Sequence, residues 1–239
     1  MFELNKEFDI TVVSEIGREN RNALILDNFY KDPDEVRQYC IDSPKSSDPD
    51  LIAGLPGWRV FEEDYRVKEN LKPLFDQLKK HPIWKHEGSD LVWEKNWDKS
   101  GFMCNVMNSK TMDIGGGIPH QDSFDIQFGS VIYLNTPEEC QGGTRLYSYF
   151  DTQSFPRPDM LASLENDVDM AGHQFNELSK NRWIRNWVDV DPLSPWKVEL
   201  EFEMVYNRCI LYEADLLHSQ WYSEGMFTDH DRIAQVLFM

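Results

Sequence analysis

From about residue 91 to the C-terminus, apolar residues recur mostly at every second position. In the segment 198–204, for example, four apolar side chains alternate with Glu199, Glu201 and Glu203. Side chains of a β-strand point alternately to opposite faces, so this pattern predicts strands with one buried and one solvated face. The expected strands are residues 102–107, 118–122, 128–135, 144–149, 198–206, 209–213 and 232–238.

The N-terminal part of the chain predicts a strand followed by helices. Residues 23–30 (ALILDNFY) predict the strand, and a helix is expected from Asp32 to about Asp42. Asp32 can cap this helix and Pro33 suits its first position, where no backbone N–H is needed. Apolar residues at helical spacing predict a second helix within residues 67–78.

Helices first and strands after favour an α+β fold around a β-sandwich or barrel. We find no convincing linker, so residues 1–239 are expected to form a single domain. Residues 23–90 would supply the supporting strand and helices, and residues 91–239 the β core. The strand pattern stops at about residues 150–196, where a helical insertion is expected.

Charge and composition exclude several classes of partner. The formal net charge is −18, which argues against binding to nucleic acid and to anionic membrane surfaces. No apolar stretch is long enough to span a membrane, and the N-terminus has no signal-peptide pattern. The four cysteines form no close pair, which favours reduced thiols and a cytoplasmic location.

Four residues in two distant segments have the chemistry of a metal site. His120 and Asp122 are two apart, so in a strand both would face one metal ion. His218 follows a buried apolar run and fits either a metal ligand or a hydrogen-bonded core histidine. Arg232 begins the last apolar strand and fits a clamp for a ligand carboxylate or a structural ion pair. His120 alone also fits a surface position, and Asp125 would replace Asp122 only if the strand ended early.

Four blocks of the sequence together resemble the Fe(II)/2-oxoglutarate-dependent dioxygenase superfamily, in its prolyl-hydroxylase-like branch. The resemblance spans roughly residues 23–239, and its sharp blocks are IPHQDSFD, FGSVIYLNTPEECQGGTRLY, NRCILYEADLLHSQW and DRIAQVLFM. It implies a double-stranded β-helix, a distorted jelly roll, with supporting N-terminal helices.

The same resemblance implies the metal ligands. His120, Asp122 and His218 match the two histidines and one carboxylate that hold Fe(II) in that family. They would be the catalytic residues. The carboxylate ligand favours hydroxylation over halogenation, since related halogenases replace it with a small residue.

The co-substrate residues also follow from the resemblance. Arg232 matches the basic residue that pairs with the distal carboxylate of 2-oxoglutarate, and Tyr133 matches a tyrosine that donates to the same carboxylate. Tyr133 also fits a strand core residue. Asn105 lies where related enzymes contact the ligand.

The implied activity is hydroxylation of an unactivated C–H bond. Fe(II) would be the cofactor, 2-oxoglutarate and O₂ would be consumed, and succinate and CO₂ would be released. The substrate would be an amino acid, a peptidyl residue or another small molecule. A homodimer is one option for the assembly. The alternative is a catalytically silent jelly-roll protein for ligand binding or assembly.

Overall fold

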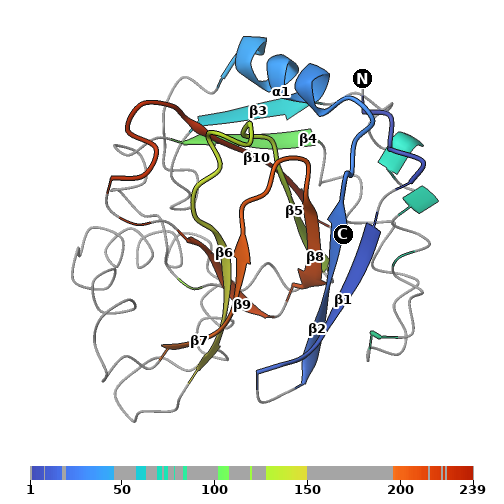
Figure 1. The fold of residues 1–239 in the computed structure, drawn as a ribbon, viewed down its shortest axis with the longest axis vertical. Helices are drawn as coiled ribbons and strands as arrows, with labels where there is room; N and C mark the ends of the chain where they lie inside the picture. The colour runs from blue at the N-terminus through green and yellow to red at the C-terminus, as the bar shows by residue number, and fades with distance from the viewer. Residues whose placement is uncertain are drawn as a thin grey trace, which may run out of the picture.

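The computed structural model contains two antiparallel sheets and a supporting helix, α1 (Pro33–Asp42; Figure 1). All paired strands, in both sheets, run antiparallel. The structure describes residues 2–7, 9–17, 20–45, 58–62, 69–71, 73–74, 78, 83–84, 102–107, 119, 128–149, 196–214, 216–221, 223 and 225–238.

The larger sheet has seven strands in the order β1-β2-β8-β5-β10-β4-β3. This order interleaves N-terminal, central and C-terminal strands, so segments far apart in the sequence become neighbours. Its strands are β1 (Asp9–Ile16), β2 (Arg21–Asp27), β3 (Trp58–Glu62), β4 (Phe102–Met107), β5 (Phe128–Tyr133), β8 (Cys209–Glu213) and β10 (Arg232–Phe238).

The smaller sheet has three strands in the order β7-β6-β9. These are β6 (Gly143–Tyr149), β7 (Trp196–Glu203) and β9 (Leu217–Trp221). In Figure 1 they lie to the left of β1 and β2. A buried cluster fills the space between the two sheets, with Val131 and Tyr212 contributed by the larger sheet and Leu146 and Phe202 by the smaller.

The opposite face of the larger sheet is covered by helical residues. Val36 and Cys40 of α1 (Pro33–Asp42) belong to a second buried cluster with Leu24, Ile132 and Leu211 of the sheet. This arrangement gives the larger sheet two buried faces, which explains why β5 and β8 are buried at every position.

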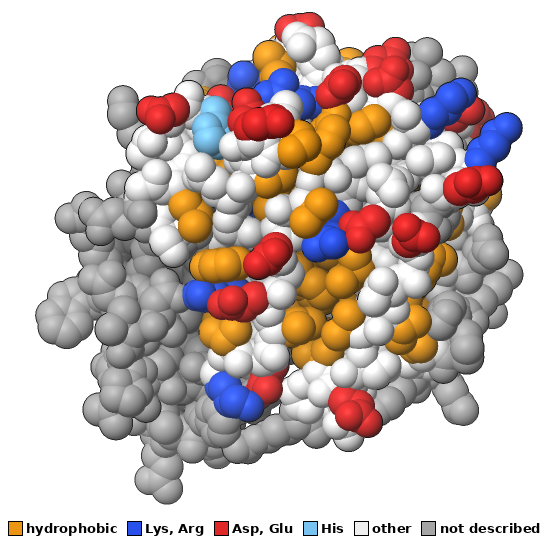
Figure 2. Space-filling view, viewed as in Figure 1, with side chains coloured by type: hydrophobic (Ala, Val, Ile, Leu, Met, Phe, Trp, Pro, Cys, Tyr) orange, Lys and Arg blue, Asp and Glu red, His pale blue; other side chains and the backbone are white. Residues whose placement is uncertain are grey.

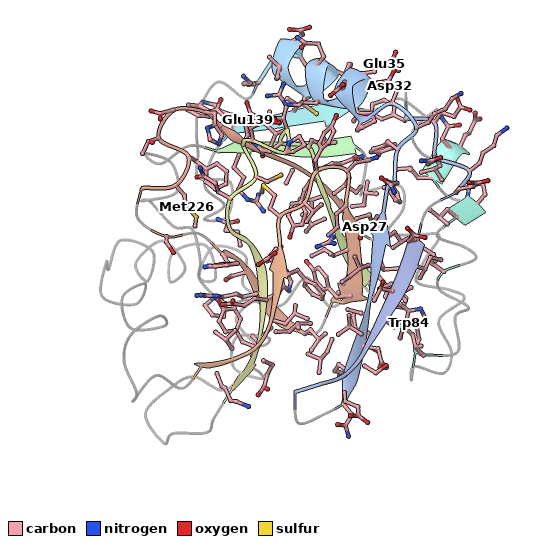
Figure 3. The ribbon with its side chains drawn as sticks, viewed as in Figure 1. Asp27, Asp32, Glu35, Trp84, Glu139 and Met226 are labelled. Carbon is pink, nitrogen blue, oxygen red and sulfur yellow. The ribbon has the colours of Figure 1, made fainter. Side chains whose placement is uncertain are left out.

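The start of α1 was predicted correctly. The Asp32 carboxylate accepts the backbone N–H of Glu35, and Pro33 is the first residue of the helix (Figure 3). Within residues 67–78, the described positions are helical, and three leucines at helical spacing are buried against α1's cluster: Leu71, Leu74 and Leu78.

The strand predictions were right for β4, β8 and β10 to the residue and for β2, β5, β6 and β7 within a few residues. Three strands, β1, β3 and β9, were not predicted. The expected strand 118–122 lies outside the described residues except for Pro119, and so does the insertion up to residue 195. The mostly antiparallel β architecture with few helices agrees with a β-rich core.

In the described part of the chain, no helix combines the length and the apolarity needed to cross a membrane. Acidic and basic side chains are interspersed on the face shown in Figure 2, with apolar side chains gathered near its centre. Among the described side chains, Cys40, Cys140 and Cys209 are free thiols, as expected.

Candidate functional site

Tyr133 links the two sheets. It is the last residue of β5, is fully buried, and its hydroxyl lies 2.7 Å from the Thr144 Oγ1 atom of β6. Burial raises the pKa of Tyr133 to about 12, although the charge of Arg232 and the bond to Thr144 oppose the shift. The phenol is therefore protonated at neutral pH and can donate a hydrogen bond.

Arg232 lies beside Tyr133. Its Cζ atom is 5.9 Å from the centroid of the Tyr133 ring, and only 3% of the residue is exposed. Tyr133 is opposite Ala234 in the β5–β10 pairing, and Arg232 is two residues from Ala234. Strand alternation thus places the arginine and the tyrosine on the same face of the larger sheet, the face toward the smaller sheet.

His218 approaches the same space from the smaller sheet. It lies within β9, opposite Leu146 of β6, and is 6% exposed. Its ring centroid is 4.7 Å from that of Tyr212, a residue of the larger sheet. β8 ends at Glu213 and β9 begins at Leu217, so His218 is the second residue of a strand of the smaller sheet.

The His218 side chain has the form of a neutral metal ligand. Its Nδ1 atom is 2.8 Å from the Leu216 carbonyl oxygen, so we assign the proton to Nδ1 and the lone pair to Nε2. Burial lowers the pKa of His218 to about 4, partly offset by that hydrogen bond. Histidine ligands commonly donate their second ring N–H to a carbonyl or carboxylate, which fixes the ring and the tautomer.

The two other predicted iron ligands, His120 and Asp122, lie outside the described residues. Asp125 does as well. The residues that the structure does describe contain no group of three or more His, Cys, Asp or Glu able to hold a metal ion. The fit to iron therefore depends on His218, whose donor atom suits Fe(II).

Asn105 lies in β4, with its backbone opposite Ala234 of β10. Arg145 of β6 is paired with Glu201 at 2.7 Å, and its Cζ atom lies 5.0 Å from the centroid of the Trp221 ring.

Sequence reasoning missed Thr144 and Tyr212. Thr144 bonds to the Tyr133 hydroxyl, and Tyr212 packs on the His218 ring. Thr144 directly follows the Gly142-Gly143 pair, which was the available signal in the sequence. No local sequence pattern indicates the role of Tyr212, because its partner His218, six residues later, lies on the other sheet.

The buried groups beside Tyr133 have the chemistry that suits an anion. Arg232 supplies the charge, and Tyr133 and Thr144 supply hydroxyl groups within the same inter-sheet core. Charge-assisted hydrogen bonds to a carboxylate are strong in such surroundings. The described geometry therefore places Arg232 beside Tyr133, while His218 contacts Tyr212 of the same inter-sheet cluster.

Comparison of the sequence with models of known protein families assigns the chain to one family. The model of the "Family of unknown function (DUF6445)" matches residues 7–231, so the chain belongs to this family. No curated protein matches the sequence.

Proposed function

We propose that this protein is an Fe(II)- and 2-oxoglutarate-dependent dioxygenase. It would hydroxylate an unactivated C–H bond of an amino acid, a peptidyl residue or another small molecule, and release succinate and CO₂. The observation that carries the proposal is the placement of Arg232 beside Tyr133 on the inner face of the larger sheet, with His218 packed on Tyr212 of the same buried cluster. These residues are 14 to 99 positions apart in the sequence (232 − 218 and 232 − 133).

The two-sheet architecture supports a jelly-roll fold. A seven-stranded and a three-stranded antiparallel sheet face each other across one core, with helical residues packed on the outer face of the larger sheet. In a double-stranded β-helix the ligand pocket lies between the sheets, and Tyr133 and Arg232 lie on the face of the larger sheet that is turned toward the smaller sheet.

Each residue has a defined task in this proposal. His218, together with His120 and Asp122, would hold the iron. Arg232 would neutralise the distal carboxylate of 2-oxoglutarate, and the protonated Tyr133 would donate a hydrogen bond to it. When bound, iron and 2-oxoglutarate supply the oxidising chemistry with O₂, while the protein positions the reactants and excludes water.

An anaerobic titration tests the metal and co-substrate together. Adding Fe(II) and 2-oxoglutarate to the protein should produce the visible charge-transfer band of a bidentate keto-acid complex. His218→Ala should abolish the band. His230→Ala is the matched control, because His230 is a half-buried histidine whose ring, like that of His218, is bonded to a backbone carbonyl, that of Glu139 at 3.0 Å. Absence of a band with the unmodified protein, with no succinate formed from any substrate, would refute the proposal.

Arg232→Ala tests the carboxylate clamp. We expect a large rise in the Kd for 2-oxoglutarate, since truncating one partner of a buried charge pair is costly. Arg145→Ala is the control, because its guanidinium is held by Glu201. If 2-oxoglutarate and metal bind but no substrate panel releases succinate, the catalytically silent alternative is favoured.

A further inference from the structure

Asn135 holds the backbone on both sides of Arg232. Its side-chain Nδ2 donates to the Asp231 carbonyl oxygen at 2.8 Å, and its Oδ1 accepts the Ile233 backbone N–H at 2.8 Å. Asn135 is fully buried. The two peptide groups that flank Arg232 are therefore bonded to one side chain.

The Asn135 side chain supplies hydrogen bonds to β10 at the point where the β5–β10 pairing ends. The β5–β10 pairing places Tyr133 opposite Ala234, and β5 ends at Tyr133. The Leu134 N–H still donates to the Ile233 carbonyl at 3.1 Å, after which the backbone of residues 135–140 turns away. The Asn135 amide takes over the hydrogen bonding at the position where Arg232 begins β10.

The amide orientation is determined by chemistry. Reversing the Asn135 amide would point its NH₂ group at the Ile233 N–H and its oxygen at the Asp231 carbonyl. Both contacts would then be repulsive, so the assigned orientation is the only favourable one. Both the donor and the acceptor of this amide are required for the arrangement.

The Asn135 amide is itself held by a network that reaches α1. Glu139 Oε2 lies 3.4 Å from the Asn135 Nδ2 atom and accepts the Thr136 N–H at 3.3 Å. Arg37 of α1 holds the same carboxylate through its Nη2 atom, at 3.0 and 2.8 Å from the two oxygens. Glu139 lies beside α1 in Figure 3. The network therefore fixes the turn after β5 against a helix.

We propose that Asn135 is a positioning residue for Arg232. By bonding the peptide groups before and after Arg232, it sets the direction in which the guanidinium enters the space between the sheets. This inference rests on the proposed function, because it assigns Asn135 to the carboxylate clamp for 2-oxoglutarate. It acts through Arg232 and makes no contact with the ligand.

The test uses the full chain with Asn135→Ala and two readouts. The first is the NMR signal of the Arg232 side-chain Nε–H, assigned by its loss in Arg232→Lys, and it requires no ligand. We expect this signal to shift or broaden in Asn135→Ala. The second is the Kd for 2-oxoglutarate with Mn(II) in place of iron, which should rise on the order of ten- to a hundredfold, as for a misplaced binding group.

The matched control is Asn22→Ala. Asn22 is also a buried asparagine whose Nδ2 donates to a backbone carbonyl, that of Ile83 at 2.6 Å. It precedes Ala23 of β2, which pairs with Tyr212, and Tyr212 pairs with Gly129, four residues before Tyr133 on β5. Asn22→Ala should lower stability while leaving the Arg232 signal and the Kd unchanged.

The outcomes separate this inference from the proposed function. If the unmodified protein binds no 2-oxoglutarate, the proposed function fails, and the Arg232 signal alone decides the positioning role. If it binds and Asn135→Ala leaves both the signal and the Kd unchanged, the positioning role is wrong. Should Asn135→Ala not fold, Asn135→Asp, which keeps the shape and the acceptor but loses the donor, takes its place. Loss of the folded state in both variants would make Asn135 a folding residue and overturn the inference.

Discussion

The hydrogen bond between Tyr133 and Thr144 should couple the stability of the two sheets. Both side chains are buried, with 0% and 3% exposure, and their oxygens are 2.7 Å apart. Tyr133→Phe removes one hydroxyl and leaves the other buried without this partner, and Thr144→Val does the reverse. Each change should cost about 1–3 kcal/mol in the free energy of unfolding, because the remaining buried polar group is no longer satisfied by its partner.

The double variant should cost much less than the sum of the single variants. With both hydroxyls gone, apolar atoms meet across the sheets and no polar group remains stranded. We expect a coupling free energy of about 1–2 kcal/mol from the double-mutant cycle. Urea unfolding followed by circular dichroism measures it, and each kcal/mol should also lower the Tm by roughly 2–4 °C for a chain of this size.

A second cycle provides the control. Tyr147 and Ser219 form a buried hydroxyl pair at 2.9 Å within the smaller sheet. Tyr147→Phe with Ser219→Ala should also show coupling in stability, but without any effect on 2-oxoglutarate affinity. Strictly additive costs for Tyr133→Phe and Thr144→Val would refute the reasoning, since the two hydroxyls would then not depend on each other.

Two further perturbations follow from the structure. Gly143→Ala should destabilise the protein by about 1–3 kcal/mol in thermal unfolding, because a Cβ there would overlap the Phe202 carbonyl oxygen of the adjacent strand; a variant as stable as the original protein would contradict this. Burial alone would raise the pKa of Glu139, but the hydrogen bonds from Arg37 and nearby groups lower it below the ordinary 4.5. This stabilisation is present at neutral pH and is lost as the pH falls below about 4.5, so the roughly 1 kcal/mol cost of Arg37→Ala should shrink in acid unfolding measurements; a pH-independent cost would disprove the pairing.

The predictable parts of the fold are those with a local signal. The start of α1 depends on Asp32 and on a proline one residue later, and both act within one helical turn. Strands β4, β8 and β10 were found because their apolar residues form compact local runs. β1 was missed because nearly all of its side chains are exposed, so burial leaves no pattern in its sequence. It is a strand through its backbone pairing with β2.

The candidate site shows the same division. Arg232, Tyr133 and His218 could be selected because their side-chain chemistry and surrounding blocks are visible in the sequence. The role of Asn135 could not be predicted, because its bonds to residues 231 and 233 cross separations of 96 and 98 positions. Nor does any local pattern indicate that Thr144 meets the Tyr133 hydroxyl across two sheets.

The strand periodicity, the capped helix and the available side-chain chemistry can all be recognised in the amino-acid sequence. These depend on backbone geometry and on neighbours within a few residues. The pairing of the strands, the faces that come together and the side chains that are buried with one another become visible in the folded chain. Strand pairing and burial depend on contacts between segments that are distant in the sequence. An alternating apolar pattern is compatible with many such pairings, so it does not select one of them.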